Sequence, residues 1–292
     1  MNKINFLVIG VQKSATSWMY YCLQDHPEIL LPEKKLEREY IGGELYDKNG
    51  LDWYLNKIPF QSNKISGDVS VDYLPNEKSI NLLKNHSNSL KFIIMLRNPV
   101  ERAFSALNWY QRMGDIGLDI DVTQAFQDGI SNMDGYKWQE RNFDFRDILH
   151  RGCYANQISE YLKKFDAKNF LILTYDLVKD DPLKAVSEIY DFLGVNTDHV
   201  PTTINKTPKK SSTNNFLVRL SSLGFQNRFI RAGLELAHQV FNKIEKKDKK
   251  IDDQLHQLLV NFYSKENTKF VSLIDDKKLR TLGRDCIQKS WK

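Results

Sequence analysis

A single lysine and several small hydroxyl residues follow a short apolar run near the start of the chain. Lys13 lies three residues after Gly10, and Thr16 and Ser17 precede a stretch that suits a helix. In a strand–turn–helix unit, the first N–H groups of the helix and its dipole attract negative charge into the turn. Together with the lysine, they predict a site for an anion such as phosphate or sulfate. The alternative is an ordinary strand-to-helix turn with a surface lysine.

The position of this lysine separates the turn from the common nucleotide-triphosphate loop. That loop follows the pattern G-x-x-x-x-G-K-[ST], and its enzymes hold Mg²⁺ with an Asp, usually at a strand end. Here the next strongly apolar run, residues 91–96, leads into Arg97. A nucleotide kinase or NTPase with a divergent loop is therefore the disfavoured alternative, and no metal is expected.

A second anion site is predicted where this apolar run ends. Asn98 and Pro99 are typical of a helix start, so Arg97 lies between a strand and a helix. An arginine there can bind a phosphate through two parallel hydrogen bonds. Arg102 and Ser105 are three residues apart and are expected on one helix face with Asn98 and Trp109. The alternative has Arg97 paired with a neighbouring carboxylate, but two anion sites together favour a ligand with two phosphate-like groups.

The surrounding pattern predicts an α/β protein with a central, mainly parallel sheet flanked by helices. Strands and helices alternate, and ligands of such sheets bind at the carboxyl ends of the strands. Lys13, Asp68 and Arg97 all come at or just after strand ends and are expected to share one crevice. The predicted strands are 4–9, 64–69, 92–96 and 170–174, and the predicted helices are 51–58, 76–85, 99–112, 153–164 and 182–193.

The remaining segments carry weaker signals. Residues 113–147 are expected to form loops and short helices, 196–215 a mobile loop, and 216–292 a helical C-terminal part of the same domain. The basic, amphipathic stretch 216–242 is expected to pack on the core rather than on a membrane. The lysine-rich stretch 243–250 is expected to be a solvated helix end or linker.

Composition predicts one soluble domain. The 292 residues are 41% hydrophobic, which suffices for one large core, and the net charge of +5 suits an anionic ligand without indicating nucleic acid. Three widely spaced cysteines show no metal-ligand spacing and fit a reduced intracellular protein. No signal peptide or apolar run long enough to span a bilayer is visible, so a cytoplasmic location is expected.

At this point the motifs resemble those of sulfotransferases that use 3′-phosphoadenosine 5′-phosphosulfate (PAPS), nearest in pattern to the heparan-sulfate-type and bacterial branch. The segment 10–17 is similar to the family's 5′-phosphosulfate loop, and 96–105 to its 3′-phosphate motif. Weaker likenesses extend over nearly the whole chain: Gly50-Leu-Asp-Trp-Tyr54, Gly67-Asp-Val-Ser-Val-Asp-Tyr73, Arg151-Gly-Cys-Tyr154, Asp191-Phe-Leu-Gly194, the region from Tyr263 to Asn267, and Trp291. The resemblance implies a P-loop-like sulfotransferase fold, PAPS as donor and 3′,5′-diphosphoadenosine (PAP) as product.

The resemblance also implies a set of site residues. Lys13 would stabilise the leaving group, and Glu37 would act as the base that accepts the acceptor's proton. Glu37 lies among Glu33 and Glu39 in a charged stretch that could instead be solvated surface. The implied donor-binding residues are Lys13, Ser14, Ala15, Thr16, Ser17, Trp18, Arg97, Ser105, Tyr154, Lys206, Lys209 and Lys210, and the implied substrate-side residues are Glu37, Tyr40, Asp68 and Tyr73.

The acceptor is less well defined by the resemblance. Val69 stands where some heparan-type members carry a lysine, Asp68 replaces the usual Glu, and Tyr40-Ile41 replaces an aromatic pair. A hydroxyl, or an amine, on a carbohydrate or small metabolite is expected as acceptor. His26 and His86 are alternative bases, favoured less as helix-end or surface residues. A non-catalytic anion-binding protein on the same fold is the other function class that stays open.

Overall fold

A computed structural model of the chain describes residues 3–140, 142–205 and 251–291. Its centre is a sheet of six strands in the order β2-β3-β1-β4-β5-β6, with every pair parallel. The strands are β1 (Phe6–Gly10), β2 (Ile29–Leu30), β3 (Ile65–Val69), β4 (Lys91–Leu96), β5 (Phe170–Thr174) and β6 (Arg280–Leu282). β1 and β5 are buried along their whole length, as continuous apolar runs in a parallel sheet require. The predicted fold class is confirmed.

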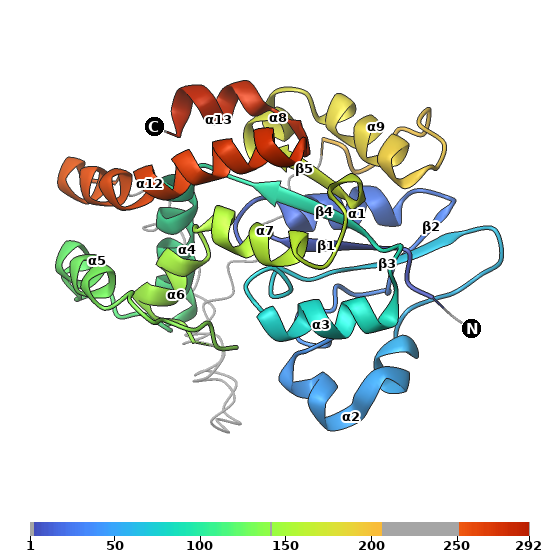
Figure 1. Ribbon diagram of the computed structural model, residues 1–292, viewed down its shortest axis with the longest axis horizontal. Helices are drawn as coiled ribbons and strands as arrows, with labels where there is room; N and C mark the ends of the chain where they lie inside the picture. The colour runs from blue at the N-terminus through green and yellow to red at the C-terminus, as the bar shows by residue number, and fades with distance from the viewer. Residues whose placement is uncertain (1–2, 141, 206–250, 292) are drawn as a thin grey trace, which may run out of the picture.

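Helices cover both faces of the sheet (Figure 1). One face packs against α1 (Thr16–Gln24) and α9 (Pro182–Leu193) through a cluster that includes Val8, Met95 and Leu173. The other face packs against α3 (Glu77–His86), α7 (Tyr154–Leu162), α12 (Asp253–Lys277) and α13 (Arg284–Ser290). Alternate strand residues therefore enter two separate cores, one on each side of the sheet.

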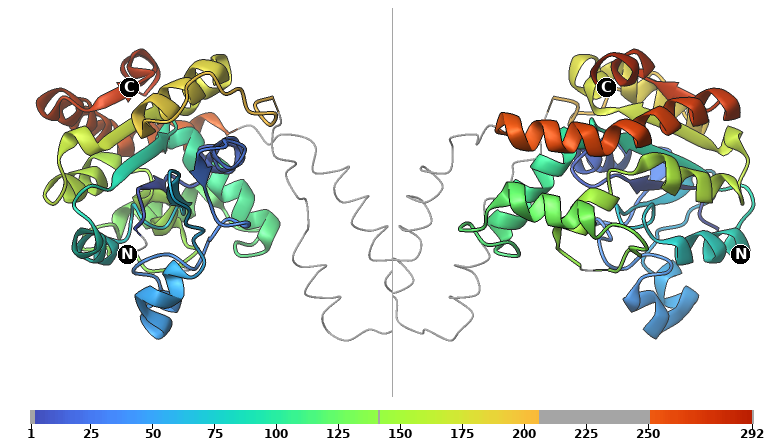
Figure 2. Two further views of the ribbon diagram at one scale, coloured as in Figure 1. Left: turned by 90° about the vertical axis from the view of Figure 1, so that its right-hand side faces the viewer. Right: turned by 60° about the vertical axis from the view of Figure 1, so that its left-hand side comes forward.

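A third cluster lies at the side of the sheet, built by α4 (Pro99–Met113), α5 (Val122–Ser131), α6 (Phe145–His150) and α12. α12 contacts α4, α5 and α7, and Figure 2 shows it lying across these helices. Two short elements, η1 (Ala167–Asn169) and α8 (Tyr175–Asp180), flank β5. The expected short helices between residues 113 and 147 are thus confirmed as α5 and α6.

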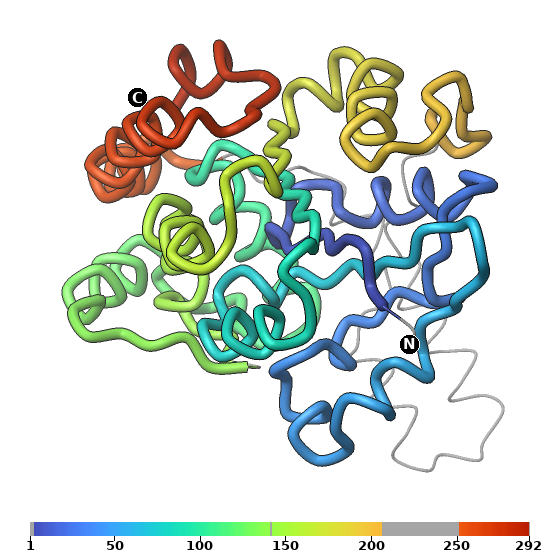
Figure 3. The backbone as a smooth tube through the Cα atoms, turned by 45° about the vertical axis from the view of Figure 1, so that its right-hand side comes forward, coloured from blue at the N-terminus to red at the C-terminus, as the bar shows by residue number. Residues whose placement is uncertain are grey.

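Three features differ from the predicted elements. β2 and β6 were not expected, and β6 interrupts the predicted helical C-terminal part. α2 (Glu44–Leu55) begins before the predicted helix at residue 51 and lies at the edge of the molecule beyond α3 (Figure 3). Gly50, with a φ of 82°, kinks α2 in the middle. The part of α2 after this kink matches the start of the predicted helix.

Part of the sequence-based prediction falls outside the described residues. Lys206, Lys209, Lys210 and the stretches 216–242 and 243–250 lie there, as does the second half of the expected mobile loop. The first ten residues of that loop are described and make specific contacts: Trp18 Nε1 donates to the Ile204 carbonyl at 3.0 Å, and Thr202 N donates to Asp25 at 2.7 Å. Across residues 3–140, 142–205 and 251–291, no helix is long and apolar enough to cross a membrane.

Candidate active site

The turn after β1 has the backbone shape of an anion cradle. φ is positive at Lys13 (69°) and at Ala15 (62°) but not at Ser14 between them, and α1 begins at Thr16. Alternating φ signs turn successive N–H groups toward one concave side, which is the arrangement that binds anions in many loops. Each non-glycine residue in this conformation costs about 1–3 kcal/mol, so the surrounding structure must hold it.

The same turn carries a buried polar atom without a partner. Ser14 is 0% exposed, and its Oγ has no hydrogen-bond partner in the described structure. Thr16 is also buried, and Ala15 leaves the start of α1 without a side-chain cap. A buried hydroxyl, uncapped helix N–H groups and a lysine are together the donor set that a phosphate or sulfate would satisfy.

Lys13 also connects this loop to the second predicted motif. Its Nζ lies 5.3 Å from the centre of the Trp109 ring on α4, in cation–π contact. Ser105 lies one turn before Trp109 on α4 and is half-buried. β1 and β4 are neighbouring strands, so the segments that follow them, carrying Lys13 and Arg97, leave the same edge of the sheet. β3 and β4 lie on opposite sides of β1, so the strand order changes direction here. Open parallel sheets bind ligands at the carboxyl ends of the strands beside such a point.

Arg97 is positioned by three neighbours. Its Nε and Nη2 donate to Glu101 Oε2 at 3.1 and 3.0 Å, and its guanidinium lies 4.8 Å from the centre of the Tyr175 ring. Its carbonyl accepts a hydrogen bond from Tyr154 Oη at 2.7 Å. The pairing with a neighbouring carboxylate is therefore present, yet the Arg97 side chain remains 22% exposed at the strand end. Tyr154 itself is buried, so its contact with this motif is through the Arg97 backbone.

Asn98 and Arg102 have structural positions in this motif. Asn98 Oδ1 accepts from the N–H groups of Val100 and Glu101, which makes it the predicted cap, and its Nδ2 donates to the Ser290 carbonyl. Arg102 lies on α4 three residues before Ser105, as the spacing predicted, but it is not open to a ligand. Its side chain is fully buried and donates to the Ile148 carbonyl, because this side of α4 faces α6.

The start of α1 contacts a residue that sequence reasoning missed. Lys35 Nζ lies 3.5 Å from Thr16 Oγ1, at the start of α1. Burial lowers the pKa of the Lys35 ammonium, while the carboxylates of Glu37, Asp68 and Asp72 act in the opposite direction. Glu37 itself is exposed. Lys35 thus contacts the start of α1 and is also influenced by the charges of nearby carboxylates. In the sequence, nothing distinguishes Lys35 from its neighbour Lys34.

Asp68 and Tyr73, expected to contact substrate, are both buried. Asp68 is 1% exposed, and its Oδ2 accepts from Tyr54 Oη at 3.0 Å and from Tyr73 Oη at 3.1 Å. Burial raises the pKa of Asp68 from 3.8 to about 7, against these hydrogen bonds and the charge of Lys35. Tyr40 is likewise buried and packs edge-on against Tyr73. The three side chains thus belong to the protein interior.

The comparison with protein families decides the assignment. The model of the sulfotransferase domain matches residues 3–237, which is most of the chain. The chain belongs to the sulfotransferase family. Sulfo-group transfer is therefore the reaction of its family, and both loops described above lie inside the matched range.

Similar proteins include large sulfotransferases of animals. The human bifunctional heparan sulfate N-deacetylase/N-sulfotransferase 1 is 29% identical over 212 residues, covering 70% of this chain and 24% of that protein. The mouse bifunctional heparan sulfate N-deacetylase/N-sulfotransferase 4 is 30% identical over 201 residues, covering 65% and 22%. This sulfotransferase chain thus spans about a quarter of the length of these relatives.

Two solved structures share the fold. A sulfotransferase from Alicyclobacillus acidocaldarius matches with a TM-score of 0.67 at 21% identity, covering 94% of this chain and 97% of that one. A mouse sulfotransferase complexed with PAP matches with a TM-score of 0.52 at 14% identity, covering 99% and 90%. At these identities, both matches show a shared fold.

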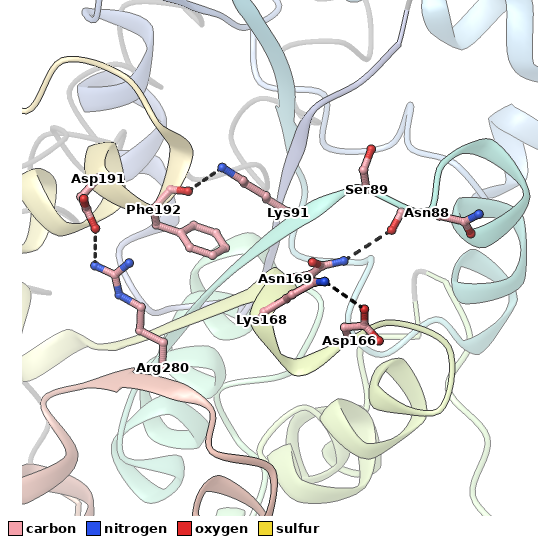
Figure 4. Close-up of a pocket in the computed structure, with 9 residues that line it drawn as sticks. All are labelled: Asn88, Ser89, Lys91, Asp166, Lys168, Asn169, Asp191, Phe192 and Arg280. Atoms are coloured by element: carbon pink, nitrogen blue, oxygen red, sulfur yellow. Dashed lines mark hydrogen bonds and ion pairs between the residues drawn. The ribbon is translucent and has the colours of Figure 1, made fainter.

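The sulfotransferase also has a cavity of about 540 Å³ at the other edge of the sheet, where β4, β5 and β6 begin (Figure 4). Each cation that lines it is already bonded to protein: Lys91 donates to the Phe192 and Leu193 carbonyls, Arg280 pairs with Glu188 and Asp191, and Lys168 pairs with Asp166. The cavity has no counterpart of the unpartnered Ser14 hydroxyl. The segments that carry Lys13 and Arg97 lie at the opposite edge, where the strands end.

Proposed function

We propose that this sulfotransferase transfers a sulfo group from PAPS to an acceptor hydroxyl or amine and releases PAP. The observation that carries the proposal is the pair of anion-binding segments after the neighbouring strands β1 and β4. One has the cradle and Lys13, the other has Arg97 and Ser105. A nucleotide with phosphate-type groups at both ends matches such a pair, whereas a single phosphate would use only one.

The donor side divides between the two segments. The N–H groups of residues 14–17 and the hydroxyls of Ser14, Thr16 and Ser17 would hold the 5′-phosphate, where the buried, unpartnered Ser14 Oγ supports a bound anion. Arg97 and Ser105 would hold the 3′-phosphate, with Tyr154 fixing the Arg97 backbone. Trp18 would act indirectly, because its hydrogen bond to the Ile204 carbonyl anchors α1.

The reaction needs charge stabilisation and removal of one proton. PAPS supplies a sulfo group that is already attached to a phosphate leaving group. Lys13 would stabilise the negative charge that develops on that phosphate, and Lys35 is placed to act from the opposite side through its contact with Thr16. Glu37 would accept the acceptor's proton, and its exposure leaves it open to an incoming substrate.

A carbohydrate, or a small hydroxylated metabolite, is the acceptor class that we propose. The names of the similar animal proteins refer to heparan sulfate and to N-sulfation, which supports a sugar acceptor and keeps an amine in consideration. The segment expected to face the acceptor is not uniformly basic, because Lys35 is accompanied by the carboxylates of Glu37 and Asp72. This mixture suits a neutral or amine-bearing acceptor better than a dense polyanion.

Calorimetric titration with PAP, 5′-AMP and ATP–Mg²⁺ tests the donor assignment. We expect PAP to bind more tightly than 5′-AMP, since only PAP occupies both segments. At 100-fold excess over its Kd, a bound ligand also adds ~2.7 kcal/mol to the free energy of unfolding. Preferential binding of ATP–Mg²⁺ would contradict the proposal and support a kinase. PAP binding without any sulfo transfer would indicate a non-catalytic binder.

A further inference from the structure

A buried chain of polar side chains runs from the donor loop to the end of β3. Gln12, the residue before Lys13, donates through Nε2 to Tyr110 Oη at 3.0 Å. Tyr110 Oη lies 2.9 Å from Asp147 Oδ2, and Arg151 Nε lies 3.0 Å from both oxygens of Asp147. Arg151 Nη2 then pairs with Asp72 at 2.8 Å. These five residues come from four separate parts of the sequence, since Asp147 and Arg151 are one helical turn apart.

The protons in this chain have one consistent arrangement. A tyrosine hydroxyl has a single proton, and a carboxylate is a stronger acceptor than an amide oxygen. Tyr110 therefore donates to Asp147 and accepts from the Gln12 amide, although its oxygen also lies 3.3 Å from Gln12 Oε1. Asp147 thus determines which way the Gln12 amide points.

Burial makes this arrangement rigid. Tyr110 and Asp147 are both 0% exposed, so water does not compete for their hydrogen bonds. The far end at Asp72 lies close enough to Lys35 to influence its pKa, and Lys35 contacts Thr16. The polar chain therefore links the residue before Lys13 to the segment that follows β3.

We propose that Tyr110 and Asp147 are positioning residues that hold Gln12 and thereby the strained backbone at Lys13. Lys13 has a φ of 69°, a conformation that persists only where neighbours constrain it. Ser14 adds no side-chain hydrogen bond to that constraint, because its Oγ has no partner in the described structure. Gln12 is the side chain next to Lys13 that is bonded to the buried core. This inference rests on the proposed sulfotransferase function.

Tyr110→Phe is the sharpest test, because it removes one hydroxyl and keeps the ring contacts with Trp109 and Phe143. Asp147 retains both bonds from Arg151 in this variant, so no buried charge is left alone. Gln12→Met removes the other end of the same hydrogen bond. Tyr190→Phe is the matched control, since Tyr190 is equally buried and donates to the Cys22 carbonyl on the other face of the sheet.

We expect Tyr110→Phe and Gln12→Met each to lower kcat for sulfo transfer roughly tenfold, the effect of one buried hydrogen bond on a positioned group. The double variant should be no worse than either single one, because both remove the same bond. Hydrogen exchange of residues 11–16 should accelerate in both variants and stay unchanged in Tyr190→Phe. Additive losses, or an equal loss in Tyr190→Phe, would overturn the inference.

The exchange measurement needs no activity and separates the two proposals. If the wild type transferred no sulfo group, the proposed function would fail, yet faster exchange in Tyr110→Phe alone would still support the positioning role. If the wild type were active and exchange at 11–16 did not respond to Tyr110→Phe, the positioning role would fail and the function would stand.

Discussion

Lys35 Nζ lies 3.5 Å from Thr16 Oγ1, and this contact joins two segments that the sequence separates by a helix and a short strand. Thr16 begins α1 beside the anion cradle, whereas Lys35 belongs to the segment that carries Glu37. The contact therefore fixes the position of the proposed base relative to the proposed donor site. It also brings a second cation, besides Lys13, to the start of α1.

Lys35→Met should lower kcat strongly while the fold is retained. The substitution keeps the aliphatic stem and removes the ammonium that would stabilise developing negative charge, an effect on the order of 10² in kcat. Lys34→Met is the control, because Lys34 is exposed and adjacent in sequence. Steady-state rates with saturating PAPS measure both. Equal rates in the two variants would mean that the Lys35 ammonium has no specific part in the reaction.

Glu37→Gln should reduce transfer by roughly 10²–10⁴, the usual range for loss of a general base. PAP affinity should stay within about twofold of wild type, because the amide keeps the shape of the side chain and the donor segments are untouched. Glu33→Gln, at an exposed position in the same charged segment, serves as control. If Glu37→Gln turned over at the wild-type rate, another residue would have to be the base.

Arg97→Ala should weaken PAP binding by roughly 10- to 100-fold, since hydrogen bonds to charged groups contribute more than neutral ones. The affinity for 5′-AMP, which lacks the 3′-phosphate, should change little. Arg112→Ala, in the last turn of α4, is the control for loss of positive charge on this helix. Calorimetry with both nucleotides measures the difference, and equal losses for PAP and 5′-AMP would contradict the 3′-phosphate assignment.

Glu101→Gln should have the opposite effect on PAP. In the structure, the Glu101 carboxylate accepts two hydrogen bonds from Arg97 and so competes with a phosphate for the guanidinium. Removing this charge should tighten PAP binding by roughly two- to fivefold, the modest effect expected for a solvent-exposed pair. The same titration detects it, and weaker binding would show that Glu101 orients Arg97 rather than competing for it.

Asp68 makes a specific contribution to the pH dependence of stability. Its pKa is about 7 in the folded protein and near 3.8 when unfolded, so the folded state binds more protons between these values. The free energy of unfolding should therefore fall as pH rises from about 4 to 7, by up to about 1.4 kcal/mol per pH unit from this group. In Asp68→Asn this contribution should disappear. Urea unfolding of both proteins at pH 5 and 7 measures it, and parallel pH profiles would refute the assignment.

The sequence predicted the parts of this site that depend on local patterns. Long apolar runs identified four of the strands, and the residues after them could be assigned to one edge because parallel strands end together. β2 and β6 were missed because two- and three-residue edge strands carry no recognisable run. Lys35 and the polar chain from Gln12 to Asp72 were missed because they depend on contacts between distant segments, which no local spacing encodes.

Arg102 illustrates the limit of helical periodicity. Its spacing from Ser105 correctly placed both on neighbouring positions of α4, but periodicity alone does not tell which side faces protein. The burial of Arg102 follows from the packing of α6 against α4, and α6 comes from residues more than forty positions later. Likewise, Asp68, Tyr54 and Tyr73 form one buried cluster although α2 and β3 come from separate segments.

Sulfo transfer itself tests the central claim most directly. The wild-type protein and Lys13→Ala should be incubated with PAPS and a panel of sugar, amino-sugar and small hydroxylated acceptors, and the products analysed by mass spectrometry. We predict that the wild type adds one sulfo group to at least one acceptor and forms PAP in equal amount, and that Lys13→Ala retains PAP binding but loses most of this turnover. A Lys13→Ala variant as active as the wild type would contradict the account.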